Sequence, residues 1–247
     1  MKVRRNFNVV FNFAHRGSLT EAPENTVSAM KKALAHNTKG IELDVQLTKD
    51  KQLVVVHDHH FKRLNENIPG KINEYTLAEI KKIDVGSSFS YEFAGESLAT
   101  LDEILELVPR DVLLNIEIKN IPLLHEGIEE ILLKCVDNHD RRDNIIVSSF
   151  DHIALQTFQA LAPDIPIGLL FYYRFIRPWD YAKMTGLDIY SLHPNGVYMT
   201  AELIESIHDA GYKVFPYTIN KEEDYEKLVA GGVDGVFSNN PNIFGTK

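Results

Sequence analysis

Strand-like and helix-like segments alternate along nearly the whole chain, and this alternation limits the possible folds more than any other feature. Each strand-like segment is a short apolar run, and each helix-like segment repeats apolar residues at helical spacing. Strands separated by helices predict a parallel sheet. The predicted strands are 7–14, 40–47, 112–118, 144–149, 165–171, 188–192, 213–219 and 235–238, with 52–57 as a second extended run beside 40–47. The predicted helices are 23–36, 101–108, 125–139, 153–161, 178–184, 201–210 and 222–230.

Eight strand positions in 247 residues favour a closed barrel, because a barrel of eight strand–helix units takes about 250 residues. The sequence therefore predicts an α/β fold, a (β/α)8 TIM barrel. An open doubly wound sheet is the alternative, and it usually carries a glycine-rich turn after its first strand. The residues that follow the first predicted strand are His15-Arg16-Gly17-Ser18 instead.

Residues 58–98 interrupt the alternation. They are polar, contain Pro69-Gly70 and Gly86, and include one short predicted helix at 77–83. Long excursions of this kind are often functional. We therefore expect a single domain over residues 1–247, with an insertion at about 58–98 that lies over one end of the fold.

The composition limits the partners of the protein. A formal net charge of −9 without a basic stripe argues against a nucleic-acid partner. The same charge repels anionic substrates, so a phosphate site would need local positive charge, which a bound divalent cation supplies. No segment approaches the ~18 apolar residues of a membrane span, and residues 1–13 lack the features of a signal peptide. We expect a cytoplasmic protein whose single cysteine, Cys135, is a buried core thiol.

Carboxylates gather on one face of two predicted strands. Residues two apart in a strand point the same way, so Glu42 and Asp44 point into the barrel together, and Glu117 shares a face with Lys119. Like charges are costly to bury unpaired. A hard cation such as Mg²⁺ or Ca²⁺ takes an oxygen-rich shell, and Glu42, Asp44 and Glu117 are its predicted ligands. The alternative is a salt-bridge network in which these carboxylates pair with Arg16 and Lys119.

Two histidines stand at predicted strand ends. His15 follows the first strand, and His57 ends the extended run at 52–57. Imidazole titrates near neutral pH, so two such rings across a phosphodiester can act as general base and general acid. Arg16 and Lys119 would contact the non-bridging phosphate oxygens. These groups together predict phosphodiester cleavage.

An ordered set of motifs resembles that of the glycerophosphodiester phosphodiesterase family. The motifs are His15-Arg16-Gly17, Glu42-Leu43-Asp44 and His57-Asp58, together with Pro23-Glu24-Asn25-Thr26 and Glu117-Ile118-Lys119. The resemblance covers nearly the whole chain. It implies a TIM barrel with a small inserted subdomain, which hydrolyses glycerophosphodiesters to glycerol 3-phosphate and an alcohol with the help of a divalent metal.

The resemblance also implies roles at the matching positions. It makes His15 and His57 the acid–base pair. It implies that Arg16 and Lys119 contact phosphate, and that the metal ligands are the three carboxylates named above.

Two segments depart from the family pattern. Tyr217-Thr218-Ile219-Asn220 stands where the family often has Trp-Thr-Val-Asn, and Ser238-Asn239-Asn240-Pro241 stands where it often has Thr-Asp before the proline. We expect Tyr217 to line the glycerol or alcohol pocket. The lost acid bears on substrate preference more than on reaction type. His193 ends a strand and could reach the site or be structural. The aromatic residues within 171–179 could pack under a loop, form a substrate wall or contact a partner.

Two alternatives to a glycerophosphodiesterase remain open. A lysophospholipase D-like enzyme would accept an acyl chain and needs an apolar trough in the insertion or near 171–179. A non-catalytic barrel that binds a phosphate ligand would lack at least one histidine or carboxylate of the site, and all five are present.

Overall fold

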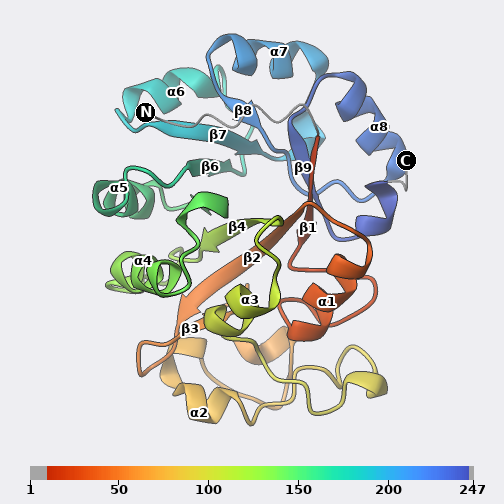
Figure 1. Ribbon diagram of the computed structural model, residues 1–247, viewed down its shortest axis with the longest axis vertical. Helices are drawn as coiled ribbons and strands as arrows, with labels where there is room; N and C mark the ends of the chain where they lie inside the picture. The colour runs from red at the N-terminus through yellow and green to blue at the C-terminus, as the bar shows by residue number, and fades with distance from the viewer. Residues whose placement is uncertain (1–9, 245–247) are drawn as a thin grey trace.

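The computed structural model describes residues 10–244 as a barrel of parallel strands surrounded by helices (Figure 1). The order of neighbouring strands is β8-β7-β6-β5-β4-β2-β1-β9. Hydrogen bonds from Phe237 N to Pro216 O (3.0 Å) and from Ile219 N to Phe237 O (2.8 Å) join the two ends of this order. The predicted TIM barrel is confirmed. Its strands are β1 (Phe11–His15), β2 (Gly40–Leu47), β4 (Leu113–Ile118), β5 (Ile145–Ser149), β6 (Ile167–Phe171), β7 (Ile189–Pro194), β8 (Lys213–Val214) and β9 (Gly235–Ser238).

Helices cover the outside of the barrel and bury their apolar faces against it. On β2, the alternate residues Ile41, Leu43 and Val45 are fully buried beneath these helices. Burying one such aliphatic side chain contributes about 1.5–3 kcal/mol. The helices are α1 (Val27–Ala35), α3 (Leu101–Leu107), α4 (Ile128–Asn138), α5 (His152–Leu161), α6 (Pro178–Met184), α7 (Ala201–Asp209) and α8 (Glu222–Ala230).

Aromatic residues fill the barrel interior below the carboxyl ends of its strands. The ring of Phe13 lies 4.8 Å from that of Phe237 and 5.4 Å from that of Phe215. All three are almost fully buried, and Ile146 packs with them. The middle of the barrel is therefore a packed core, and a polar site has room only at the carboxyl ends of the strands.

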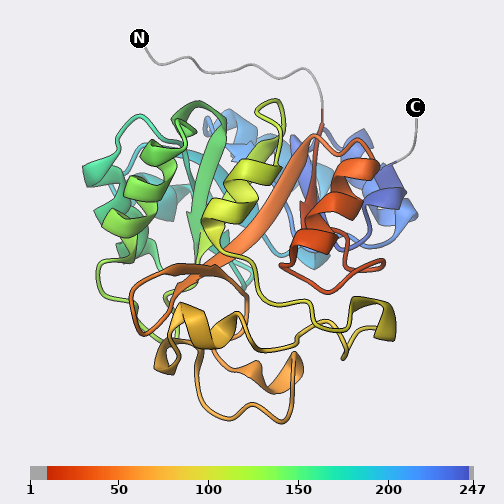
Figure 2. The same cartoon turned by 60° about the horizontal axis from the view of Figure 1, so that its bottom comes forward.

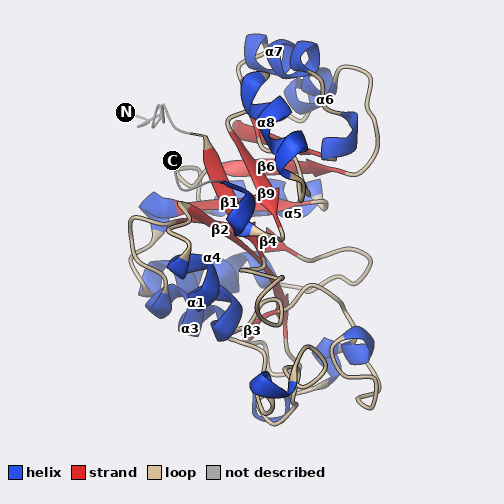
Figure 3. Cartoon of the chain, turned by 90° about the vertical axis from the view of Figure 1, so that its right-hand side faces the viewer, coloured by secondary structure: helices blue, strands red, loops and turns tan. Residues whose placement is uncertain are grey.

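Residues 56–100 leave the barrel after β3 (Leu53–Val55), which pairs antiparallel with β2. The segment holds η1 (Phe61–Arg63), η2 (Ile72–Glu74), α2 (Leu77–Ile80) and η3 (Tyr91–Phe93). Phe61, Ile72 and Ile80 are fully buried in a cluster separate from the main core. Figures 2 and 3 show these residues as short helices and loops beside one end of the barrel. That they form an inserted subdomain stays a prediction.

Several predicted helix and strand boundaries were wrong, each for a local reason. Helix α1 begins at Val27 rather than 23, because the side chain of Thr26 accepts a hydrogen bond from Ala29 N and caps the helix. Helix α4 begins at Ile128 rather than 125, after Gly127 in a left-handed conformation. Strand β8 ends at Val214 rather than 219, since Pro216 has no N–H to offer a neighbouring strand. The predicted start of the first strand, residue 7, lies outside the described residues.

Within residues 10–244, no helix has the length and apolar character needed to cross a membrane.

Candidate active site

Three carboxylates meet toward the carboxyl ends of two adjacent barrel strands, β2 and β4. The register places Asp44 opposite Glu117, and Glu42 opposite Asn115. One oxygen from each of Glu42, Asp44 and Glu117 lies within 4.8 Å of the others. Burial, together with the charges of Asp44 and Glu117, raises the pKa of Glu42 well above its usual range. Such crowding of like charges is unfavourable unless a cation offsets it.

Two basic side chains offset part of this charge. Lys119 Nζ lies 2.7 Å from Glu117 Oε1 and 3.8 Å from Asp44 Oδ1. Arg16 Nε lies 3.3 Å from Asp44 Oδ2. Burial works against ionisation of Asp44, but Arg16 and Lys119 hold the pKa of that carboxyl below its ordinary value. The salt-bridge network considered from the sequence is therefore present.

The salt bridges leave the carboxylates incompletely satisfied. Only two basic side chains serve the three carboxylates, and one of them, Arg16, also pairs with Glu24 (Nη1 to Oε1, 3.2 Å). Glu42 Oε1 and Asp44 Oδ1 are buried without a hydrogen-bond partner among the described residues. Buried polar atoms are rarely left unpaired. The donor set therefore fits a hard divalent cation better than it fits a closed ion-pair network.

The loop after β1 is shaped to hold Arg16 over these carboxylates. Arg16 has a φ of 57°, and its N–H donates to the backbone oxygen of Glu42 at 2.9 Å and to its Oε2 at 3.0 Å. A side chain on Gly17, whose φ is 86°, would come within 2.6 Å of the Ala29 backbone. Asn25 Nδ2 donates to Asp44 Oδ2 at 2.9 Å. These contacts explain why the histidine–arginine–glycine motif and the later asparagine occur together.

His15 lies beside the carboxylates with one ring nitrogen already engaged. Its Nδ1 is 2.6 Å from Asn239 Oδ1, which can only accept, so Nδ1 carries the proton. Its Nε2 then presents a lone pair and lies 3.8 Å from Glu42 Oε2. Burial, with the charge of Arg16 adding to it, lowers the pKa of His15 to about 4. His15 is therefore neutral at neutral pH.

A chain of ion pairs links His57 to Arg16. His57 Nδ1 lies 2.7 Å from Asp58 Oδ1, and Asp58 Oδ2 accepts from Arg63 Nε at 2.7 Å. Arg63 reaches from η1 and donates two further hydrogen bonds to Glu24, of 2.5 Å and 2.7 Å. Glu24 in turn accepts from Arg16. The polypeptide after β3 is thereby tied to both the β1 loop and the imidazole of His57.

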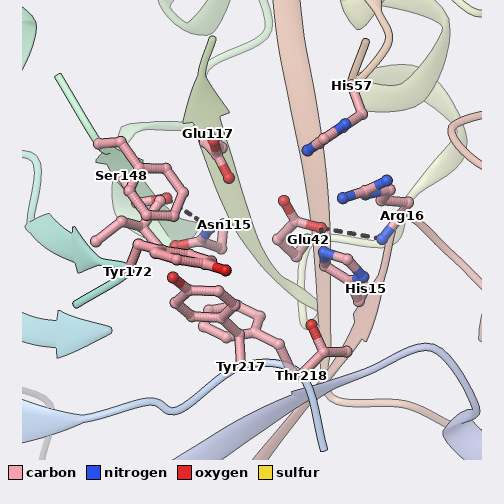
Figure 4. Close-up of a pocket in the computed structure, with 13 residues that line it drawn as sticks. His15, Arg16, Glu42, His57, Asn115, Glu117, Ser148, Tyr172, Tyr217 and Thr218 are labelled. Carbon is pink, nitrogen blue, oxygen red and sulfur yellow. Dashed lines mark hydrogen bonds and ion pairs between the residues drawn. The ribbon is translucent and has the colours of Figure 1, made fainter. Parts of the chain in front are cut away.

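Aromatic side chains form the other side of a cavity of about 310 Å³ (Figure 4). Tyr172 and Tyr217 line it opposite His57 and Arg16, with Glu42 and Glu117 between them. The ring of Phe150 meets that of Tyr217 edge to face at 5.8 Å. The hydroxyl of Tyr217 donates to the backbone oxygen of Phe171 at 2.9 Å.

The structure answers two questions that the sequence left open. His193 is fully buried inside the barrel, where its Nε2 lies 2.8 Å from Ser191 Oγ. A side chain at Gly168 would come within 2.4 Å of that ring, and His193 does not line the cavity. The aromatic segment divides: Phe171 is buried, whereas Tyr173 is 75% exposed and Ile176 is 93% exposed.

All eight predicted site residues belong to one connected group at this cavity. Six line its wall, and Asp44 and Lys119 join them through their ion pairs with Arg16 and Glu117. Sequence reasoning assigned no role to Glu24, Asn25, Arg63 and Asn239. The first two belong to a recognised motif, which was a usable signal. Asn239 lies in the segment that departs from the family pattern, which was also a signal, whereas Arg63 carried none, because only folding brings it to the site.

Around one cavity, the carboxyl end of the barrel brings together buried carboxylates, two imidazoles and two basic side chains. This arrangement defines the protein as a (β/α)8-barrel enzyme. Comparison with known proteins identifies its family.

The model of the glycerophosphoryl diester phosphodiesterase family matches residues 15–243. A glycerophosphodiester phosphodiesterase of Caldanaerobacter subterraneus is 43% identical over 229 residues, which are 92% of this chain and 93% of that protein. Another, from Bacillus altitudinis, is 37% identical over 234 residues, 93% of this chain and 94% of its own. An Oleispira antarctica phosphodiesterase, solved in complex with the product sn-glycerol-3-phosphate, is 33% identical. Its TM-score is 0.85 over 94% of this chain and 93% of that chain. The chain belongs to the glycerophosphoryl diester phosphodiesterase family, as its motifs predicted.

Proposed function

We propose that this protein hydrolyses glycerophosphodiesters to glycerol 3-phosphate and an alcohol, using a divalent cation and a histidine pair. One observation carries the proposal. Three buried carboxylates, two of whose oxygens have no hydrogen-bond partner among the described residues, lie together with two imidazoles on one side of the cavity. The Oleispira relative, which was solved with sn-glycerol-3-phosphate, supports the substrate class.

Glu42, Asp44 and Glu117 would hold the cation, Mg²⁺ or Ca²⁺. Their oxygens converge within 4.8 Å, and both ions prefer carboxylate oxygen over nitrogen or sulfur. A bound cation would neutralise negative charge on the phosphate oxygens as the transition state forms. It would also remove the like-charge repulsion that raises the pKa of Glu42.

The two histidines would divide the proton transfers. His15 is neutral, and its free Nε2 faces the carboxylates, so we assign it the general base. His57 Nδ1 lies 2.7 Å from Asp58 Oδ1, and this contact orients the ring and leaves Nε2 free, so we assign His57 the general acid that protonates the leaving alkoxide. Direct attack by water and initial attack by the glycerol 2-hydroxyl both agree with this assignment.

The basic residues and Tyr217 would position the substrate. Arg16 and Lys119 are aimed at the carboxylate cluster, where they could bind the non-bridging oxygens of a phosphodiester. An Arg fork and a Lys point charge are both suited to this role. Tyr217 lines the opposite wall, and we propose that it contacts the glycerol or alcohol part of the substrate.

A lysophospholipase D-like activity is the second candidate. The observation in its favour is the loop after β6, where Tyr172 lines the cavity while Tyr173 and Ile176 are largely exposed. An exposed apolar surface beside the cavity could receive an acyl chain. Rates on lysophosphatidylcholine and on glycerophosphocholine would separate the two candidates.

The decisive experiment measures glycerol 3-phosphate release from glycerophosphocholine by metal-stripped protein, before and after Mg²⁺ or Ca²⁺ is added. We expect no release without metal and release with at least one ion. Glu42→Gln, which keeps the size but removes the charge, should need far more metal for the same rate. Metal-independent release, or an unchanged metal requirement in Glu42→Gln, would contradict the proposed cation site.

Three further predictions rest on the sequence alone. A single domain over residues 1–247 with an inserted subdomain at about 58–98, a cytoplasmic location and the absence of a nucleic-acid partner stay predictions.

A further inference from the structure

A second group of side chains with metal-binding donors lies between helices α3 and α4, outside the catalytic cavity. Asp102 comes from the first turn of α3. Cys135 comes from α4, and His139 follows directly as its C-cap residue. One donor atom from each lies within 4.8 Å of the others. None of the three lines the cavity.

The placement of these residues follows from helix geometry. Cys135 and His139 are four residues apart, so their side chains share one face of α4. Asp102 comes from the neighbouring helix and faces both. Its Oδ1 lies 3.6 Å from Cys135 Sγ and 2.7 Å from His139 Nε2. The same carboxylate oxygen thus contacts both the thiol and the imidazole.

A plain hydrogen-bonded helix contact would also bring these three groups together. The kind of donor argues for more than that. Thiolate, imidazole and carboxylate in one cluster are the ligand types of zinc, whereas an oxygen-only set such as that of Glu42, Asp44 and Glu117 suits Mg²⁺ or Ca²⁺. Residues 10–244 therefore hold two clusters whose donors prefer different classes of metal.

The distances are close to those that a metal would need. Zinc bonds of about 2.3 Å to sulfur and about 2.0 Å to oxygen, at tetrahedral angles, place those two atoms about 3.5 Å apart. The observed separation is 3.6 Å. The distance between His139 Nε2 and Asp102 Oδ1 would have to increase from 2.7 Å to about 3.3 Å. Asp102 can make this movement because its side chain is 60% exposed.

We propose that Asp102, Cys135 and His139 form a binding site for a zinc-class divalent transition metal, with water as the fourth ligand. Burial, with Asp102 adding to it, raises the pKa of the Cys135 thiol to about 12. The metal therefore displaces the thiol proton to solvent as the metal–sulfur bond forms. No oxidant or reductant is needed.

Such a site would fasten α3 to α4. Helix α3 directly follows residues 56–100, and Glu103 beside Asp102 pairs with Lys81 of that segment at 2.5 Å. A metal here would therefore stabilise the end of the segment that supports His57 through Asp58 and Arg63. This stabilisation acts outside the cavity and does not depend on the proposed catalytic cation.

The test uses Co²⁺ as a spectroscopic substitute for zinc on the full-length, metal-stripped protein. Cobalt bound to a thiolate gives a charge-transfer absorption that carboxylates and imidazoles do not give. Cys135 is the only cysteine, so this band reports on this site alone. We expect one equivalent of Co²⁺ to produce the band, Zn²⁺ to abolish it stoichiometrically, and Mg²⁺ to leave it unchanged.

Matched variants separate a built site from a reactive thiol. Cys135→Ser should lose the band, and Asp102→Asn and His139→Gln should each weaken Co²⁺ binding. Glu42→Gln, in the other cluster, should keep the band at full intensity. Absence of the band in folded wild-type protein would overturn the proposal. So would a band of unchanged affinity in Asp102→Asn and His139→Gln, because it would come from the thiol alone.

Discussion

The two sides of the catalytic cavity are built in different ways. On the side of β1, β2 and β4, three carboxylates are buried, and contacts of about 2.5 to 3.3 Å hold Arg16, Glu24 and the half-exposed Arg63 around them. On the side of β5 to β8, the wall is formed by Phe150, Tyr172 and Tyr217. The rings of Phe150 and Tyr217 are in contact, and the Tyr217 hydroxyl donates to the backbone oxygen of Phe171. The loop beyond Tyr172 is largely exposed.

This difference separates two requirements of a phosphodiesterase. Proton transfer and charge neutralisation need atoms fixed within fractions of an ångström, and buried ion pairs supply that rigidity. Recognition of an alcohol group tolerates a looser apolar wall. We therefore expect changes on the charged side to lower kcat and changes on the aromatic side to alter KM.

The largest effects should come from the histidines. His15→Ala and His57→Ala should each lower kcat on glycerophosphocholine by about 10²–10⁴-fold, because each removes one proton transfer. Glycerol 3-phosphate release with saturating metal measures this, and circular dichroism shows whether the fold is kept. A folded variant with kcat near that of wild type would remove that histidine from the mechanism.

Asn239 should matter through the ring that it orients. Asn239→Ala removes the acceptor at His15 Nδ1 and should lower kcat by about 10-fold, as loss of a partner behind a functional histidine commonly does. The matched variant Asn239→Asp keeps an acceptor and should retain most of the rate. Equal losses in both variants would show that Asn239 does more than accept this hydrogen bond.

Arg63 should act on catalysis without touching the substrate. Arg63→Met breaks the links to Asp58 and Glu24, so kcat should fall by about 10-fold with little change in KM. Arg63→Lys can restore one ion pair but not the paired hydrogen bonds of the guanidinium group, so its kcat should lie between those of wild type and Arg63→Met. A rise in KM with unchanged kcat would instead place Arg63 in substrate binding.

The same ion pairs should appear in the pH dependence of stability. Although burial opposes it, hydrogen bonding to Arg63 lowers the pKa of Glu24, and hydrogen bonding to His57 and Arg63 lowers that of Asp58. Carboxyls with lowered folded-state pKa values stabilise the fold above their unfolded values, near about 4, and lose this as the pH falls further.

Urea unfolding of wild type and Arg63→Met checks this sign. At pH 7 the variant should be less stable by about 1 kcal/mol, a small value because Arg63 is half exposed and screened by solvent. The difference should shrink as the pH falls below about 4. A difference that grows toward acid would mean that the carboxyls are not stabilised by Arg63 in the fold.

The smallest effect is expected at Tyr172. Tyr172→Ala should raise KM by a few-fold, with kcat within about twofold, because a largely exposed apolar contact is worth about 1 kcal/mol or less, and a tenfold effect needs about 1.4 kcal/mol. Comparing glycerophosphocholine with lysophosphatidylcholine shows which part of the substrate the ring meets. A fall in kcat with constant KM would contradict the division between the two sides.

The sequence by itself determined the barrel and which carboxylates share a face on its charged side. Strand–helix alternation is a local property, and the two-residue period of a strand places Glu42 beside Asp44 whatever surrounds them. The same reasoning predicted His15 and His57 as an acid–base pair, because they stand at predicted strand ends, and both line the cavity. Sequence reasoning misplaced the start of α1, where a threonine cap and a tight loop override helical periodicity.

Only the tertiary structure decided which distant residues support the site. Asn239 reaches His15 across 224 positions, and Arg63 reaches Glu24 across 39. His193 also stands on a strand, yet it is buried in the barrel, where its ring packs against Phe215 and Phe237. Such pairings depend on barrel closure and strand register, which bring separated segments together. A single sequence contains no local signal for them.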